Sequence, residues 1–340
     1  MDTAPLAIVA HSEWTWTPAE LGVGGKQRKF VLSRGQVAWA MADAFLRPGA
    51  GPWGRMNWSR LEGWPAAVAA ERLRCLQDYF ERVMQECDMT TLIEYEWINQ
   101  KDDADLDMAM RVDHVEIHEG RMEEADGAGA IVDFANSKLH IHSIIASVTQ
   151  EELIFSTHSE CFLGLTLFPD EMGDDDCIVM RNVWRHANYT GYLDSFRYAG
   201  PAVPSVFVDV IAIDASAGAQ WTYGVQRDIH KAHMGFSAVS SLHISTGNWG
   251  CGAFGGDPML KLLQQTLAAQ LAGKVLRYST FGNHKQALEF RSLLEAIAKT
   301  PGVTCRWMRW ILAMYDPFPF TQSCDLYVRS NLMLKELRGE

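Results

Sequence analysis

The 340-residue sequence contains no apolar run that approaches the roughly 18 residues needed to cross a membrane. Its first residues, MDTAPLAIVAHSEW, lack the basic start of a secretion signal. Its seven cysteines form no CxxC pair, and an odd number is typical of reduced thiols rather than of a disulfide framework or a zinc site. We therefore expect an intracellular protein, nuclear or cytoplasmic, with no membrane contact, no metal and no cofactor.

Positive charge is also scarce, because 30 Lys and Arg face 42 Asp and Glu and give a formal net charge of −12. Broad adhesion to nucleic acid needs a basic face, so we expect no direct nucleic-acid binding. An anionic ligand would have to be held locally, by backbone donors and a few side chains. Low-complexity tracts and internal repeats are missing too, while 48% hydrophobic residues is ample for a buried core. These features predict a globular protein, which we expect to be monomeric.

The first hundred residues are predicted to be largely helical. Ser33 and Gln36 form a possible capping box, and apolar residues follow at helical spacing. A second, longer helix is predicted from Ala66 to Glu86. The polar, acidic stretch from residue 101 to 107 indicates a boundary. We therefore predict a helical accessory region over residues 1–105 and a main domain with C-terminal helices over residues 106–340.

Short strand candidates alternate with helices beyond that boundary. The predicted strands span residues 112–118, 130–134, 177–183, 206–213, 242–245 and 275–280. The predicted helices lie near residue 150 and over residues 225–235, 257–272 and 284–299. This alternation predicts an α/β fold in which helices cover both faces of a sheet.

A glycine-rich stretch lies between the strand predicted at 242–245 and the helix predicted at 257–272. Asp257 can cap this helix, Pro258 suits its first turn and Gly273 can end it. Glycines before the cap let successive N–H groups point at an anion near the positive end of the helix. The stretch therefore predicts a phosphate cradle, and the alternative is a turn that only lets the helix pack on the strand.

Three of these glycines, Gly250, Gly252 and Gly255, also match the GxGxxG pattern of dinucleotide-binding folds. No acidic residue follows at roughly 20 positions to bind a ribose, which disfavours that fold. The nearby Trp249 and the site candidates Asn248 and Phe254 instead suggest recognition of a sugar and a ring.

A second constellation is formed by Gln150, Glu151 and Glu152 at the start of a predicted helix. Adjacent carboxylates project about 100° apart on a helix, so one can face a ligand while its neighbour faces another part of it. Such a pair could bind a ribose and protonate a leaving group. The alternative is that acidic residues favour the first turn of a helix for electrostatic reasons.

Six segments then occur in a recognisable order: VDFAN, TQEE, YTGY, VIAIDA, TGNWGCGAFGGD and TFG. Together they resemble the catalytic region of poly(ADP-ribose) glycohydrolases, and the twelve-residue block from Thr246 is the most specific of them. The resemblance implies a macrodomain-like mixed sheet flanked by helices, after an N-terminal helical accessory region. It also implies hydrolysis of ribose–ribose O-glycosidic bonds in poly(ADP-ribose) or on ADP-ribosylated proteins. Release of ADP-ribose in this way would reverse ADP-ribosylation in the DNA damage response.

The same resemblance implies roles for individual residues. Glu152 is implied as the catalytic acid, and Glu151 and Asn136 as ligands of the ribose hydroxyls. Glu123 is implied to read the adenine edge, Phe281 to pack against the adenine, and residues 252–254 to line the diphosphate and ribose. The substrate-binding positions are Glu123, Asp133, Phe134, Asn136, Gln150, Tyr192, Asn248, Gly252, Ala253, Phe254 and Phe281. Asp133 has an alternative role as a structural residue at the end of a strand.

One segment departs from the family pattern, which has three successive glycines where this chain has His140, Ile141 and His142. A β-branched residue is a genuine outlier at positive φ, so we expect a re-routed loop with non-positive φ at Ile141. We also expect Glu152 to face an open pocket. The two imidazoles could contact phosphate or be structural.

The altered segment keeps a second function open. The chain could be a macrodomain that binds ADP-ribose or poly(ADP-ribose) with little or no catalysis. A nucleotide enzyme that does not act on ADP-ribose fits less well, because Glu123, Asn136, Tyr192 and Phe281 would then match the family by coincidence. The sequence does not distinguish attack at chain ends from attack within the polymer.

Overall fold

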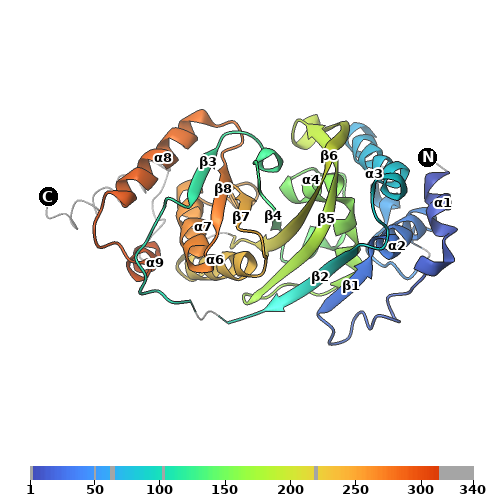
Figure 1. The fold of residues 1–340 in the computed structure, drawn as a ribbon, viewed down its shortest axis with the longest axis horizontal. Helices are drawn as coiled ribbons and strands as arrows, with labels where there is room; N and C mark the ends of the chain where they lie inside the picture. Colours follow the sequence, from blue (N-terminus) through green and yellow to red (C-terminus); the bar gives the residue numbers. More distant parts are fainter. Residues whose placement is uncertain (1–2, 50, 62–65, 102–103, 218–220, 314–340) are drawn as a thin grey trace. The chain divides into compact units, whose positions relative to one another are not determined.

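The computed structural model describes residues 3–49, 51–61, 66–101, 104–217 and 221–313 (Figure 1). The chain forms two compact units whose segments alternate along the sequence. The first unit comprises residues 1–98, 135–173 and 178–212, and the second comprises residues 99–134, 174–177 and 213–340. The predicted domain boundary at residue 105 stays a prediction. Within the described ranges, no helix is long and apolar enough to cross a membrane.

The first unit contains the helices expected near the N-terminus. Helices α1 (Ala4–Val9), α2 (Arg34–Leu46) and α3 (Ala66–Glu86) pack against one another. The capping box of α2 forms as predicted, since the Ser33 hydroxyl accepts from the Gln36 N–H at 3.2 Å and the Gln36 side chain accepts from the Ser33 N–H at 2.9 Å. Helix α3 has the bounds that its apolar spacing predicts.

The strands of the first unit are antiparallel. Strand β1 (Lys29–Ser33) pairs with β2 (Leu92–Asn99), and β5 (Asp176–Thr190) pairs with β6 (Arg197–Asp214). Strands β5 and β6 are both longer than the strands predicted there, and they form a long hairpin. The shorter helices α4 (Gln150–Thr157) and α5 (Gly164–Leu167) also belong to this unit.

The second unit has parallel strands covered by helices (Figure 1). Strands β4 (Ala130–Ala135), β7 (His243–Thr246), β8 (Val275–Ser279) and β3 (Val115–His118) pair in that order. Helix α6 (Trp221–Ser237) packs on α7 (Pro258–Ala272), α9 (Cys305–Ala313) packs on both, and α8 (His284–Ala298) packs on β3. The predicted class, a mixed α/β fold with strands flanked by helices, is confirmed.

Candidate functional site

The N-terminus of α4 positions the two adjacent carboxylates. Glu152 is the third residue of this helix, and its Oε2 accepts from the Thr149 N–H at 2.8 Å and from the Thr149 hydroxyl at 2.5 Å. Glu152 is only 3% exposed, so little of its surface reaches solvent, and the expectation that it faces an open pocket stays a prediction. Its other oxygen, Oε1, accepts no hydrogen bond from any residue that the structure describes. Thr149 therefore fixes the carboxylate and leaves one oxygen to bond a ligand.

The neighbouring carboxylate of Glu151 is held by backbone donors. Its Oε1 accepts from the His140 N–H at 2.5 Å, and its Oε2 accepts from the Asn136 N–H at 3.3 Å. The Asn136 side chain is used within its own turn, where Oδ1 accepts from the Lys138 N–H at 3.0 Å. The first unit thus brings Asn136, Glu151 and Glu152 together, as the sequence predicts.

The altered segment keeps a left-handed conformation, with φ of 51° at His140, 47° at Ile141 and 55° at His142. The prediction of a re-routed loop with non-positive φ at Ile141 is therefore wrong. The Ile141 side chain is 44% exposed, so it clashes with no packed core and only the backbone is strained. His142 is tied down separately, because its Nε2 lies 3.0 Å from the Asp170 carbonyl.

The imidazole of His140 is buried and stabilises this turn through hydrogen bonds. Its Nε2 lies 3.3 Å from Nη2 of Arg72, and its Nδ1 lies 2.5 Å from the Ser143 carbonyl. A guanidinium can only donate, so Nε2 accepts and Nδ1 carries the proton that bonds Ser143. Burial, followed by the charge of Arg72, lowers the pKa of His140 to about 4. His140 is therefore a neutral structural residue, which favours that alternative over a phosphate contact.

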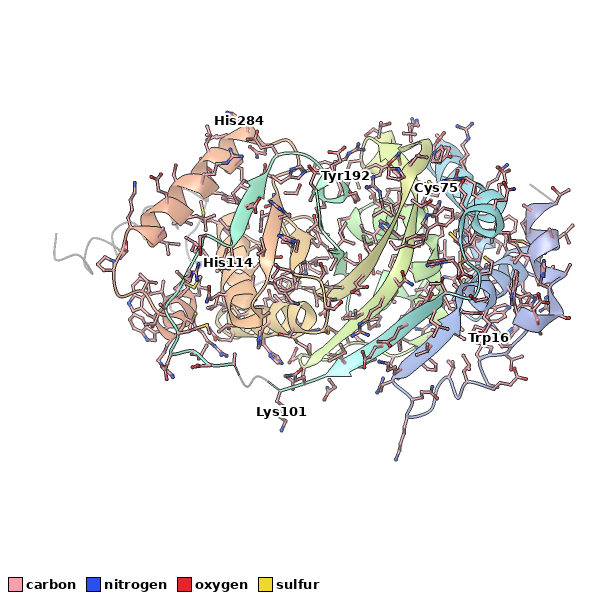
Figure 2. All side chains as sticks on the ribbon, in the orientation of Figure 1. Trp16, Cys75, Lys101, His114, Tyr192 and His284 are labelled. Atoms are coloured by element: carbon pink, nitrogen blue, oxygen red, sulfur yellow. The ribbon has the colours of Figure 1, made fainter. Side chains whose placement is uncertain are left out.

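Tyr192 lies in the turn between β5 and β6 (Figure 2). Burial raises the pKa of its phenol, and the negative charge of Glu152 raises this pKa further. Tyr192 is therefore within electrostatic reach of Glu152, while 37% of its surface stays exposed. Gln150 is the first residue of α4 and is half-buried. The five site candidates of the first unit are Asn136, Gln150, Glu151, Glu152 and Tyr192.

The second unit holds the residues implied in adenine recognition. Glu123 lies on a short 3₁₀ helix (Met122–Glu124) whose Met122 carbonyl accepts from the Ser245 hydroxyl at 2.6 Å. A Cβ placed on Gly247 would lie 3.6 Å from Met122 and 3.7 Å from the Phe134 ring, so these groups lie close together. Phe281 follows β8 with φ of 50° and is 52% exposed.

Asp133 is the site candidate buried most deeply in this unit, within β4. This position agrees with its alternative role as a structural residue of the strand.

The glycine-rich loop leads into α7 as its sequence predicts. Asp257 Oδ1 accepts from the Leu260 N–H at 2.9 Å and caps the helix, and Gly273 ends it with φ of 64°. Gly250 has φ of 74°, and a Cβ there would lie 2.5 Å from the Ala215 Cβ. By contrast, a Cβ on Gly252 would meet nothing within 4 Å. The loop therefore exposes its backbone at Gly252, beside the exposed Ala253 and the half-buried Phe254.

Trp249 does not offer a ring to a ligand, which corrects the interpretation from the sequence. It is fully buried, and its Nε1 donates to the Ile213 carbonyl at 2.9 Å. The Lys261 ammonium lies 4.5 Å from the Trp249 ring centroid and bonds the carboxylate of Asp228. This buried ion pair beneath the loop was missed by sequence reasoning. Its signal was a lysine at the N-terminal end of a helix, where the dipole disfavours a cation.

A third constellation has the connectivity of a nucleophile, base and acid. Ser159 Oγ lies 2.9 Å from His186 Nε2, and His186 Nδ1 lies 3.1 Å from Asp78 Oδ2. All three residues are buried, and Ser159 and His186 have no exposed surface. Asp78 is also bonded by Arg82 and by the hydroxyl of Tyr198. We therefore regard this network as structural.

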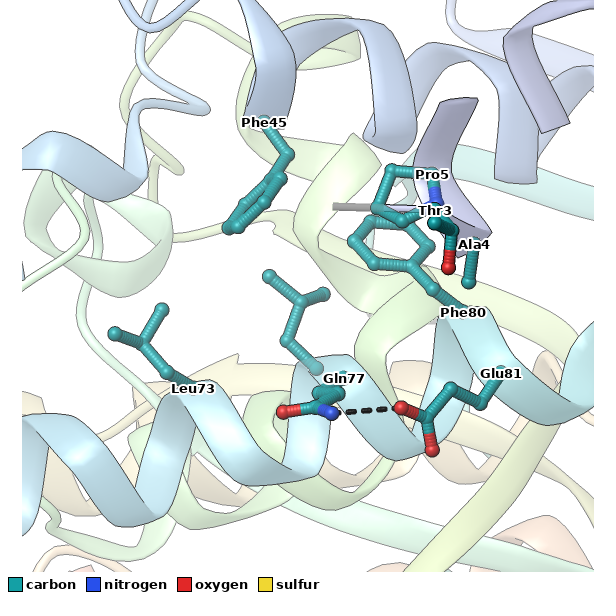
Figure 3. Close-up of a pocket in the computed structure, with 9 residues that line it drawn as sticks. Thr3, Ala4, Pro5, Phe45, Leu73, Gln77, Phe80 and Glu81 are labelled. Atoms are coloured by element: carbon teal, nitrogen blue, oxygen red, sulfur yellow. Dashed lines mark hydrogen bonds between the residues drawn. The ribbon is translucent and has the colours of Figure 1, made fainter. Parts of the chain in front are cut away.

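A mainly apolar pocket lies between α1, α2 and α3 (Figure 3). Among the described residues that line it, Glu81 alone has an ionisable side chain, which accepts from Gln77 Nε2 at 2.6 Å. None of the candidate site residues lines it. The lining residues are Thr3, Ala4, Pro5, Phe45, Leu73, Leu76, Gln77, Phe80 and Glu81.

Comparison with known proteins gives a family match over residues 101–288, to the model described as "Poly (ADP-ribose) glycohydrolase (PARG), Macro domain fold". A probable poly(ADP-ribose) glycohydrolase 2 of Arabidopsis thaliana is 29% identical over 241 residues, with 53% of this chain and 46% of the relative covered. Poly(ADP-ribose) glycohydrolase 1 of Caenorhabditis elegans is 25% identical over 311 residues, with 80% and 38% covered. The chain thus spans about half or less of the length of these two relatives.

Solved structures of similar proteins include two poly(ADP-ribose) glycohydrolases. Poly(ADP-ribose) glycohydrolase from Thermomonospora curvata is 12% identical, with 72% of this chain and 98% of that chain covered and a TM-score of 0.42. A mutant of the enzyme from Deinococcus radiodurans in complex with ADP-ribose is 18% identical, with 70% and 97% covered and a TM-score of 0.39.

Proposed function

Because this chain belongs to the poly(ADP-ribose) glycohydrolase family, we propose that it hydrolyses the ribose–ribose O-glycosidic bonds of poly(ADP-ribose) and releases ADP-ribose. The observation that carries this proposal is the pair of carboxylates at the start of α4. Glu152 is fixed through one oxygen by Thr149, and Glu151 is fixed by two backbone N–H groups. Two carboxylates held this rigidly can perform different tasks on one sugar.

Glu152 acts as the general acid and base in this proposal. Its protonated carboxyl gives a proton to the ribose oxygen that leaves as the glycosidic bond breaks. The resulting carboxylate then takes a proton from the incoming water. Glu151, with Asn136 beside it, binds the ribose hydroxyls and so sets the distance between the anomeric carbon and Glu152. The negative diphosphate of the substrate lies near the anomeric carbon and helps to stabilise an oxocarbenium-like transition state.

The remaining contacts divide by the part of the ligand they would recognise. Glu123 and Phe281 bind the adenine, and Tyr192 closes over the ligand from the turn after β5. Backbone groups around Gly252 hold the diphosphate and the ribose attached to it, because that loop leaves open space where a Cβ would lie. The other contacts are Phe134, Gln150, Asn248, Ala253 and Phe254.

The competing function is a module that binds ADP-ribose without turning it over. It rested on the loss of three glycines, and the left-handed conformation of residues 140–142 supports catalysis instead. The test is to incubate the purified chain with automodified poly(ADP-ribose) and to separate the products by chromatography. Free ADP-ribose is the expected product. Binding of ADP-ribose without release would favour the binding module, and neither binding nor release would contradict both functions.

A further inference from the structure

Arg72 of α3 is a buried cation whose guanidinium joins three parts of the first unit. Its Nε donates to the Ser156 hydroxyl of α4 at 2.9 Å. Its Nη1 donates to the carbonyls of Ile145 and, at 3.3 Å, Ser147, and its Nη2 donates to His140. Burial lowers the pKa of Arg72 to about 10, against the opposing effect of the Glu152 charge, so it stays protonated at neutral pH. One side chain thus ties the accessory helix to the altered turn and to α4.

His140 transmits this anchor to the carboxylates. Its ring packs against two buried aromatic rings that also contact each other, with centroids 5.0 Å from Phe155 and 5.7 Å from Phe162. Its backbone N–H donates to Glu151 at 2.5 Å. His140 therefore connects a ring that is fixed by packing, through its own backbone N–H, to the carboxylate of Glu151, which is proposed to bind the ligand.

The same anchor accounts for a turn that its residues would not adopt alone. Side chains with a Cβ disfavour the left-handed region, and β-branched Ile141 disfavours it most. Such strain persists only where surrounding structure determines the conformation. Here that structure is the buried His140 ring, because the Ile141 side chain is exposed.

We propose that Arg72 is a positioning residue of the active site, which clamps the His140 ring and thereby holds the left-handed turn whose N–H fixes Glu151. This inference rests on the proposed glycohydrolase function. It gives the accessory helix α3 a part in catalysis, and it explains how this chain keeps the turn without glycines.

Two single glycine substitutions at adjacent positions distinguish the effect of losing the clamped ring from the effect of relieving backbone strain. Both His140→Gly and Ile141→Gly remove a Cβ from a left-handed residue, but only the first removes a buried ring. We expect Ile141→Gly to keep kcat within about twofold and to raise Tm by about 1–3 °C. We expect His140→Gly to lower both Tm and kcat, the latter by about tenfold or more. Equal shifts for the two variants, or a gain in kcat for His140→Gly, would overturn the clamp.

A double-mutant cycle tests whether Arg72 acts through Glu151. Arg72→Met should lower kcat about tenfold or more in the wild-type background, and much less in a Glu151→Gln background, because both changes act on one carboxylate. The control is Arg82→Met on the same helix, where Arg82 bonds Asp78 and Glu86 away from the turn. Its effect on kcat should be within about twofold in both backgrounds. Additive effects of Arg72→Met and Glu151→Gln would contradict the proposal.

The two experiments also keep failure of the clamp distinct from failure of the function. If Arg72→Met does not fold, His140→Gly replaces it in the cycle with Glu151→Gln. If the wild-type chain releases no ADP-ribose, the glycohydrolase function fails, and with it the catalytic part of this inference. The opposite Tm shifts of His140→Gly and Ile141→Gly then still decide whether the ring holds the turn.

Discussion

Two imidazoles of the first unit, His140 and His158, are buried and held neutral. Burial is the main cause, and it lowers their pKa to about 4 and about 3. Both pKa values lie below the ordinary 6.5, so the unfolded chain takes up protons first as the pH falls. The stability that the neutral rings contribute is therefore complete above about pH 6.5 and is lost as the pH drops towards 4.

We predict that each ring lowers the free energy of unfolding by roughly 2 kcal/mol as the pH falls from 7 to 5, because the unfolded chain takes up the proton first. Urea denaturation at a series of pH values measures this slope. The variant His158→Gln removes one titrating group, so its curve should be flatter than that of the wild type even if the variant is less stable throughout. An unchanged slope in His158→Gln would contradict the assignment.

Two aromatic residues are predicted to bind the ligand through their exposed rings. Tyr192→Ala and Phe281→Ala should each weaken ADP-ribose binding by about 1–3 kcal/mol, the range found for bases stacked on aromatic side chains. Calorimetry with ADP-ribose measures the loss. Trp310→Ala is a matched control, because Trp310 of α9 is also exposed but is not a site candidate. Unchanged affinity in both test variants would place the ligand elsewhere.

Interactions between sequence neighbours correctly predicted the conformation of several residues, whereas long-range contacts determine the conformation of others. The cap at Asp257, the left-handed Gly273 and the capping box at Ser33 depend on neighbours within a few positions. The conformation of Ile141 could not be predicted in this way. It depends on a ring contact between His140 and Arg72, which are separated by 68 residues.

At the scale of elements, we predict that alanine substitutions at two glycines of the loop before α7 differ in their effect on stability. Gly250→Ala should destabilise the chain by about 2 kcal/mol or more, because φ is positive and the new Cβ would meet Ala215 at 2.5 Å. Gly252→Ala should change stability by less than about 0.5 kcal/mol, since its Cβ would face open space.

The Gly252 methyl should instead weaken ADP-ribose binding, because it occupies the space where the diphosphate is proposed to lie. Chemical denaturation and calorimetry on both variants separate the two effects. If Gly252→Ala keeps full ADP-ribose affinity, the loop is a packing turn and not a phosphate cradle.

Comparison of the predicted with the observed strands shows which strands can be recognised from the sequence. The six predicted strands are present near their expected positions, because each is a short apolar run bounded by turn residues. Strands β1 and β2 were missed, although β2 carried a signal in the buried alternation of Ile93, Tyr95 and Trp97. Strand β6 extends beyond its apolar run, since its pairing with β5 continues to Arg197 although the first half of the strand is mostly exposed.

At the scale of the whole molecule, the net charge of −12 sets how the chain meets a polyanion. This net charge predicts that no broad basic face contacts the polymer, so binding should rest on local donors around one diphosphate and release few counterions. We predict that kcat/KM falls by less than about tenfold between 50 and 200 mM salt. A fall of about a thousandfold would indicate an extended basic contact with the polymer and would contradict this account.

We propose above that this chain hydrolyses poly(ADP-ribose) with Glu152 as its acid. The most direct measurement is the initial rate of ADP-ribose release from one polymer preparation by the wild type and by Glu152→Gln, with ADP-ribose affinity measured beside it. We expect release by the wild type and a loss of at least about a hundredfold in the variant. Affinity should stay within about tenfold, because the residue acts mainly in the transition state. A variant that keeps most of the wild-type rate would contradict the mechanism, and a wild type that releases no ADP-ribose would contradict the function.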